Sequence, residues 1–228
     1  MRSAAPPFSS WTHATLMRRA HAASMESTHL AHQLSGYHVV TPDGPVGRVR
    51  DLYVDDRRWM ARYLVVELRH ALASRRVLVS PVCVRAVDAD TRRLEVSLLR
   101  EQIRHAPDVD DDRPVSRQHE IALHEYYGIP FYWTDEDPAV TRPADPHLRS
   151  VRAVRGYTAI GRDAAIGHVE DFVIDVGGWR VTGIVVARRH WLSGPRRTLP
   201  VRDITRISWV GKAVYVDAAT LERVDRPA

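Results

Sequence analysis

Short runs of hydrophobic residues, broken by polar turns, follow one another through most of the chain. Residues 59–68 carry hydrophobic side chains on both alternating faces, which is typical of a β-strand covered on both sides. In the preceding run, 45–55, the hydrophobic positions are 46, 49, 52 and 54. A strand keeps such positions on one face only through a β-bulge, and bulges with glycine kinks curve a sheet enough to close a small barrel. The pattern therefore predicts a mostly β protein built from short, curved strands.

This pattern occurs twice, 120 residues apart and without a gap. Ten of the 31 positions in 36–66 are identical in 156–186, and conservative hydrophobic pairs fill several of the others. A repeat of this period predicts two copies of a small domain, because solenoid units are shorter, at about 20–50 residues. The repeated glycine, aspartate and tryptophan positions are Gly36, Gly47, Asp51, Asp55 and Trp59 in the first copy and Gly156, Gly167, Asp171, Asp175 and Trp179 in the second.

These repeated residues are interpreted as structural. Trp59 and Trp179 begin the central strand of each copy, so we expect them in the barrel walls. The four repeated aspartates could form a carboxylate site. Aspartate side chains, however, commonly accept hydrogen bonds from backbone N–H groups in turns and bulges, and we expect that role here.

The repeat also divides the chain into segments. We expect a disordered leader, a first barrel, a connector and a second barrel, at residues 1–29, 30–104, 105–147 and 148–220. An alternative for the leader is that it is an over-extended start, with Met25 as the initiator. Within the connector a helix is predicted at about 115–127, because Ser116 can cap its start and Gly128 can end it.

The connector is unusually rich in aromatic residues, with five in the eight positions 126–133. Aromatic residues at this density commonly pack against another surface. We expect this cluster to cover the outer faces of the central strands, within one chain or across a homodimer, and to leave a groove for a partner. The candidate docking residues are Tyr126, Tyr127, Tyr132 and Trp133.

Charge is distributed unevenly between these segments. The formal net charge of the chain is +5 at pH 7; residues 34–103 carry +3, residues 150–228 carry +5, and the residues between them carry −5. The positive charge of the two lobes is compatible with an anionic binding partner. They lack the interleaved basic and aromatic residues that are typical of nucleic-acid binding, so we expect a protein partner rather than nucleic acid.

Residues for catalysis or metal binding do not come together in the sequence. Cys83, the single cysteine, lies in a hydrophobic run and is expected to be a buried hydrophobic residue rather than a nucleophile. Glu120 and His124 are four residues apart and are expected on the surface of the connector helix, without a third metal ligand. We therefore expect no enzyme activity, no metal and no cofactor. No hydrophobic run approaches the roughly 18 residues of a membrane-spanning helix.

The repeated motifs resemble the PRC-barrel family over residues 34–103 and 148–217. The resemblance is carried in the first copy by Gly36-Tyr37, Asp43-Gly44-x-x-Gly47, Val49-x-Asp51-Leu52-x-Val54-Asp55, Trp59-x-x-Arg62-Tyr63-Leu64-Val65-Val66 and Val77-Leu78-Val79-Ser80-Pro81. The prototypes of this family are the cytoplasmic domain of the photosynthetic reaction-centre H subunit and the C-terminal domain of the ribosome maturation factor. The second copy departs from the pattern at Gly183, where the first has a tyrosine.

The resemblance implies two SH3-like PRC barrels in tandem, joined by a short helical, aromatic-rich connector. It also implies a non-catalytic, cytoplasmic binding or scaffold protein that mediates protein–protein interactions, including those of membrane-associated complexes. The alternative is an RNA-binding or ribosome-assembly role. The family has no catalytic constellation, so it nominates no site residues, and the partner is not identified.

Overall fold

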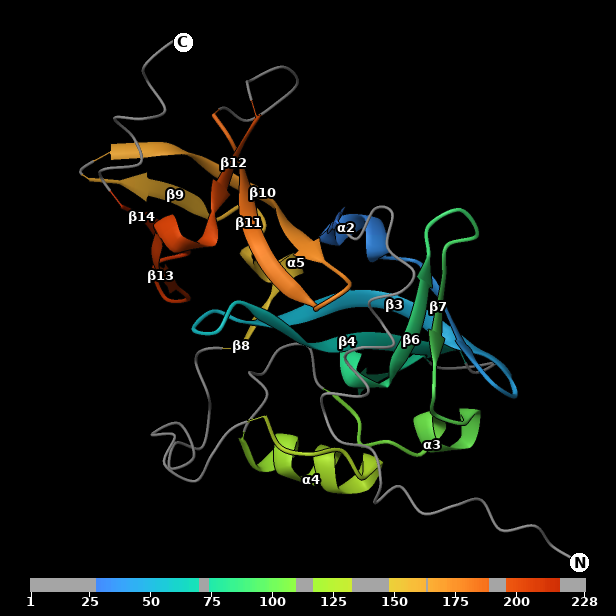
Figure 1. Ribbon diagram of the computed structural model, residues 1–228. Helices are drawn as coiled ribbons and strands as arrows, with labels where there is room; N and C mark the ends of the chain where they lie inside the picture. Colours follow the sequence, from blue (N-terminus) through green and yellow to red (C-terminus); the bar gives the residue numbers. More distant parts are fainter. Residues whose placement is uncertain are drawn as a thin grey trace, which may run out of the picture.

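A computed structural model describes residues 28–69, 74–109, 117–132, 148–162, 164–188 and 196–217. Within these residues the protein is mostly β, with two lobes of similar construction (Figure 1). The first lobe contains β2 (His38–Thr41), β3 (Gly44–Asp55), β4 (Met60–Arg69), β5 (Ser74–Val79), β6 (Val84–Asp88) and β7 (Arg93–Val96). The second contains β9 (Thr158–Gly161), β10 (Ala164–Asp175), β11 (Arg180–Ala187), β12 (Arg196–Pro200), β13 (Ile204–Ser208) and β14 (Ala213–Val216).

The two lobes repeat the same geometry at a shift of 120 residues. The pairing of β3 with β4 changes register between Val49 and Asp51, and that of β10 with β11 changes between Val169 and Asp171. These irregularities are the bulges that the hydrophobic pattern predicts. A side chain at Gly47 would collide with the backbone of β4, and one at Gly167 with the backbone of β11. Glycine is therefore required at both positions by the close approach of two strands.

Trp59 and Trp179 are placed differently from the prediction. Each lies in the turn before the central strand, in the left-handed conformation (φ 52° and 53°), rather than in a barrel wall. The two turns meet at the junction of the lobes. The Ala61 N–H donates to the carbonyl of Trp179 and the Val181 N–H to the carbonyl of Trp59, both at 2.8 Å. The tryptophans therefore lie beside a pseudo-twofold axis. At this axis the first residues of β4 and β11 pair with each other.

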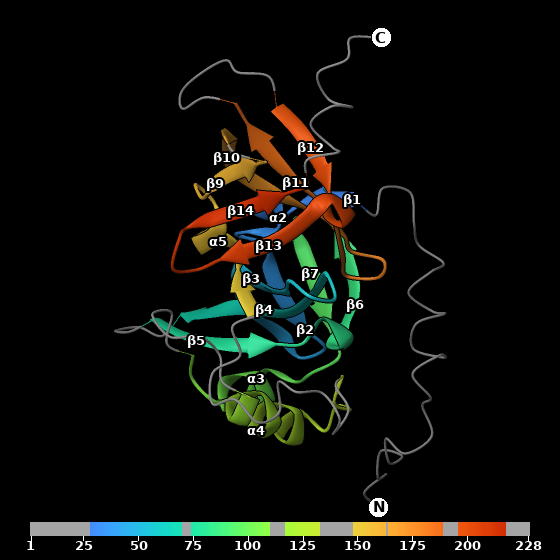
Figure 2. The same ribbon diagram turned by 90° about the vertical axis from the view of Figure 1, so that its left-hand side faces the viewer.

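The lobes also exchange their first strands. β1 (Thr28–Leu30) precedes the first lobe but pairs with β10 of the second, and β8 (Leu148–Ser150) precedes the second lobe but pairs with β3 of the first. Figure 2 shows β1 beside the second lobe. Thr28 and His29, which were expected in the disordered leader, belong to β1; residues 1–27 lie outside the described part of the chain.

A short helix follows each exchanged strand and is held by an aspartate of the other lobe. These helices are α2 (Ala31–Leu34) and α5 (Val151–Val154). Asp171 accepts a hydrogen bond from the N–H of His32 at 3.3 Å, and Asp51 accepts one from the N–H of Arg152 at 3.0 Å. Each carboxylate also accepts from the N–H of the next residue of its own strand, at 2.8 Å. Asp51 and Asp171 therefore join the two lobes, and they also accept hydrogen bonds from backbone N–H groups at the bulges.

One hydrophobic core runs through both lobes. Buried residues of β3 and β4, such as Leu52 and Leu64, belong to the same contiguous cluster as Phe172 and Ile184 of β10 and β11. Cys83, in the 3-10 turn at Pro81–Cys83, is buried in this cluster, and burial raises the pKa of its thiol to about 12. A thiol of this kind stays protonated at neutral pH, as expected for a residue that packs rather than reacts.

Candidate functional site

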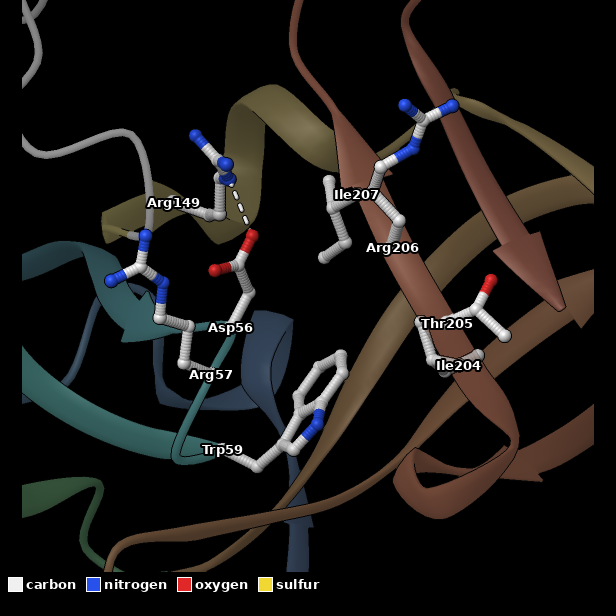
Figure 3. A pocket seen from close by; sticks show the side chains of 8 residues that line it. All are labelled: Asp56, Arg57, Trp59, Arg149, Ile204, Thr205, Arg206 and Ile207. Atoms are coloured by element: carbon white, nitrogen blue, oxygen red, sulfur yellow. Dashed lines mark hydrogen bonds and ion pairs between the residues drawn. The ribbon is translucent and has the colours of Figure 1, made fainter.

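A cleft of about 280 Å³ lies where the two lobes meet. One wall is the turn after β3, together with the end of β8, and the other wall is β13 of the second lobe (Figure 3). Its lining residues come from both copies of the repeat and are Asp56, Arg57, Trp59, Arg149, Ile204, Thr205, Arg206 and Ile207. The exchange of β8 is what brings Arg149 into this cleft, because its own lobe lies on the far side of the junction.

The cleft is basic. Three arginines and one aspartate line it, which gives a formal charge of +2 when Asp56 is ionised. Arg149 is 9% exposed, and its Nε donates to Asp56 Oδ2 at 2.7 Å. Arg57 and Arg206 are exposed, and the Arg206 guanidinium lies over the Tyr215 ring at 4.4 Å. Arg57 and Arg206 are therefore solvent-exposed at the rim of the cleft, while Arg149 is held against Asp56.

Burial raises the pKa of Asp56 to about 6, and the adjacent Arg149 opposes that rise. The Asp55 carboxylate on the same turn raises it further, and Arg57 lowers it. Near pH 6 the cleft therefore changes its charge, because protonation of Asp56 removes the negative charge that neutralises Arg149.

The turn that carries Asp56 and Arg57 is held rigidly by Asp55. Asp55 is fully buried, and its Oδ1 accepts from the N–H groups of Arg57 and Arg58, each at 3.0 Å. Its Oδ2 accepts from Arg62 Nη2 at 3.2 Å. Asp175 holds the equivalent turn of the second copy, accepting from the Gly177 N–H at 3.1 Å. The repeated aspartate thus orients the wall of the cleft without taking part in its surface.

The pseudo-twofold axis generates a second junction that carries less charge, with Arg85, the equivalent of Thr205, as its one arginine at these positions. At the equivalent positions Val176 stands for Asp56, Gly177 for Arg57, His29 for Arg149 and Ala86 for Arg206. The two copies agree at the positions that build the junction, such as Asp55 and Asp175. They differ at the positions that carry the charge of the cleft. The charged cleft is therefore a difference between the two copies and not a by-product of the fold.

The predicted docking residues of the connector lie elsewhere, against the first lobe. The helix α3 (Arg100–Arg104) ends the first-barrel segment, and α4 (Arg117–Tyr127) lies in the connector. The buried Tyr127 hydroxyl donates to the carbonyl of Leu78 at 3.0 Å, and that of Tyr126 to the carbonyl of Gln102 at 2.9 Å. The Tyr132 hydroxyl donates to Glu120. Trp133 and the expected helix cap, Ser116, lie outside the described residues.

The expectation that Glu120 and His124 lie on a helix surface is wrong. They are 0% and 3% exposed, and both face the Tyr63 hydroxyl, at 2.8 Å from Glu120 Oε1 and 3.1 Å from His124 Nε2. His124 Nδ1 lies 2.9 Å from the carbonyl oxygen of Pro130. The charged appearance of the helix misled the sequence interpretation, because a tyrosine on the outer face of β4 gives these polar groups a buried partner. In the second copy that tyrosine is Gly183.

The chemistry of the cleft is that of anion binding. Guanidinium groups bind carboxylates and phosphates through paired N–H donors. Within the described ranges, no group of three or more histidine, cysteine, aspartate or glutamate side chains is arranged to hold a metal ion. The sequence interpretation did not single out Arg57, Arg149 or Arg206. The signal that could have found them is the set of charged positions at which the two copies differ.

A family model described as the PRC-barrel domain matches residues 26–103 and again 147–223. Each match begins before an exchanged strand and ends after the last strand of a lobe, so the two matches follow the repeat. A comparison with curated proteins finds no match for the chain. No helix in the part of the chain that the structure describes is long and hydrophobic enough to cross a membrane.

Proposed function

Because the chain belongs to the PRC-barrel domain family, we propose that it is a non-catalytic binding protein whose interlobe cleft holds an acidic segment of a partner protein. The observation that carries this proposal is the convergence of Arg57, Arg149 and Arg206 from both copies on one cleft, at positions whose equivalents across the pseudo-twofold axis are not arginine. As part of the proposal, each copy is an SH3-like barrel, and the protein acts as a scaffold in the cytoplasm.

The walls of the cleft suit a protein segment. Arg57 and Arg206 are exposed, and the partly buried Trp59 provides hydrophobic surface beside the buried Ile204 and Ile207. A segment that combines carboxylates with hydrophobic side chains would satisfy both features. Asp55 holds the backbone of the turn, and the Arg206 side chain lies over the Tyr215 ring, so part of the binding surface is ordered before a ligand arrives.

RNA remains the alternative ligand, because the same guanidinium groups could contact phosphates. Phosphate binding has a distinct signature, since each neutralised phosphate releases counterions and affinity falls steeply with salt. A cleft that holds a short acidic peptide through a few carboxylates and a hydrophobic wall depends less on salt. The two ligand classes can therefore be separated by direct titration.

The experiment is a titration of fluorescein-labelled decaglutamate, followed by anisotropy. We expect Arg57→Glu and Arg206→Glu each to weaken binding by about tenfold or more, because each reverses a charge in the cleft. The matched control is Arg85→Glu, which makes the same change on an exposed arginine of β6, the edge strand equivalent to β13. Equal losses in all three variants would reject the cleft as the site. Tighter, steeply salt-dependent binding of decauridylate would favour RNA instead.

A further inference from the structure

We propose that the partner binds as an extended acidic strand, paired with the free edge of β13. This inference rests on the proposed function and names the form in which the acidic segment is recognised.

β13 is an edge strand. In the described part of the chain it pairs with β14 and with no other strand, so it ends the path of the sheet. The backbone groups on the outer edge of such a strand are available to pair with another chain. Addition of a peptide strand to a free sheet edge is a recurring mode of recognition, in which the backbone supplies affinity and alternate side chains supply specificity.

The cleft runs along this free edge. Successive side chains of a strand point to opposite faces of a sheet, so a cleft that meets only one face contacts every second residue. Here the four consecutive residues Ile204 to Ile207 all line the cleft. Ile204 and Ile207 are buried, whereas Thr205 and Arg206 are exposed. The pairing of β13 with β14 changes register between Ile204 and Arg206, and such a bulge turns consecutive residues toward the same side. The cleft therefore follows β13 from Ile204 to Ile207.

The opposite wall determines which strand fits. Arg57 and Arg149 belong to the wall opposite β13, with the Arg57 guanidinium turned toward the outer side of that wall, and Arg206 extends from β13 itself (Figure 3). A strand lying between them has side chains within reach of arginines on both sides. Carboxylates at alternate positions complement this charge, whereas basic residues would be repelled.

The hairpin of β13 and β14 extends the surface beyond the cleft. Trp209 and Val210, at its tip, are 48% and 96% exposed. A hydrophobic residue at one end of the added strand can pack on these side chains. The expected partner segment is therefore short and extended, with alternating acidic residues and a hydrophobic residue beside them.

β6 serves as an internal control for this inference. It ends the sheet at the other side, as the pseudo-twofold mate of β13, and it also has a free edge within the described ranges. Its surroundings carry Val176 and Gly177 in place of Asp56 and Arg57. An acidic strand should therefore add to β13 and not to β6.

The test uses the full chain and a terminally blocked heptapeptide in which valine and glutamate alternate. Two N-methylated versions are compared, one methylated at the amides of the odd residues and one at those of the even residues. N-methylation removes an N–H donor and adds bulk, but it leaves the carboxylates in place. In a strand paired along one edge, only one set of amides faces β13. We expect that version to bind at least tenfold more weakly than the other, with slower hydrogen exchange at residues 204–208 when the unmodified peptide is bound.

Two outcomes separate this inference from the proposed function. The first is that both N-methylated peptides bind with equal affinity and that this binding depends on the arginines. That result would overturn strand addition but would leave the acidic-segment proposal standing. Binding of decaglutamate but not of the heptapeptide would do the same. No arginine-dependent binding of either probe would overturn both. Protection of residues 84–88 to the same extent as 204–208 would contradict the choice of β13.

Discussion

At the scale of single residues, neighbouring aspartates have distinct roles that their sequence positions alone do not reveal. Asp51 and Asp171 hold the exchanged helices, Asp55 holds the turn of the cleft, and Asp56 is paired with Arg149 inside the cleft. The repeat identified the first three because both copies contain them. Asp56 was missed because its importance depends on Arg149, which is 93 residues away in the chain.

Asp56 should make stability depend on pH. Burial raises its pKa from 3.8 to about 6, so the folded chain binds this proton more tightly than the unfolded chain. The stabilisation is complete below pH 3.8 and is lost as the pH rises through about 6. The charged groups that act on the pKa of Asp56 are Arg149 of β8 and the neighbouring Asp55 and Arg57.

The measurement is urea unfolding of the wild type and of Asp56→Asn at several pH values. We expect the wild type to lose stability relative to the variant between about pH 4 and pH 7, by up to roughly 3 kcal/mol. Other titrating groups are common to both proteins and cancel in the difference. Parallel pH profiles would show that Asp56 has no raised pKa in the folded protein.

At the scale of elements, local pattern predicted the strands and bulges, but it could not predict which strands pair. The bulges follow from hydrophobic positions within one run, such as 45–55, and the structure has them in both copies. The exchange of β1 and β8 leaves no such mark. Because β3 and β10 carry the same motif, the sequence offers β1 and β8 an equivalent pairing partner in either lobe. The three-dimensional arrangement determines which of the two partners each strand pairs with.

The exchanged helix α2 should depend on Asp171. Asp171→Ala leaves the buried N–H of Phe172 without its side-chain acceptor and removes the bond to the His32 N–H. We expect a loss of roughly 2–4 kcal/mol in the free energy of unfolding, because buried donors without an acceptor are costly. Asp90→Ala, at an exposed turn position, is the control and should cost little. A similar, small effect of both substitutions would argue against the interlobe role of Asp171.

The docking of α4 should depend on the Tyr63 hydroxyl. Tyr63→Phe removes the bonds to Glu120 and His124, and we expect a loss of about 1–3 kcal/mol together with faster hydrogen exchange in α4. Tyr157→Phe is the control, because Tyr157 also packs in the core but no hydrogen bond of its hydroxyl is found within the described residues. Unchanged exchange of the α4 amides in Tyr63→Phe would show that the helix is held by other contacts.

At the scale of the whole molecule, the two copies form one body rather than two domains on a tether. The sequence predicted two similar lobes, and the shared core and exchanged strands show how they are joined. The cleft is a consequence of this joining, because no single copy contains its residues. That is the physical reason why the site could not be predicted from either repeat alone.

The joining can be tested by cutting the chain. A protease site placed within residues 137–144, followed by cleavage, should leave the two halves associated in gel filtration without denaturant. The reason is that two strand pairings and a continuous core hold them together. An intact chain lacking the protease site is the control. Halves that separate at micromolar concentration would contradict the exchanged arrangement.

The most direct test of the binding site is a map of amide chemical shifts on the ¹⁵N-labelled full chain during titration with decaglutamate. If the arginine-lined cleft is the site, the largest shifts fall on residues 56–59 and 204–207. Their pseudo-twofold equivalents, 176–179 and 84–87, should move much less, because they share the backbone geometry but contain Arg85 as their one arginine. Equal shifts at both junctions, or shifts confined to other surfaces, would contradict the assignment of the cleft as the binding site.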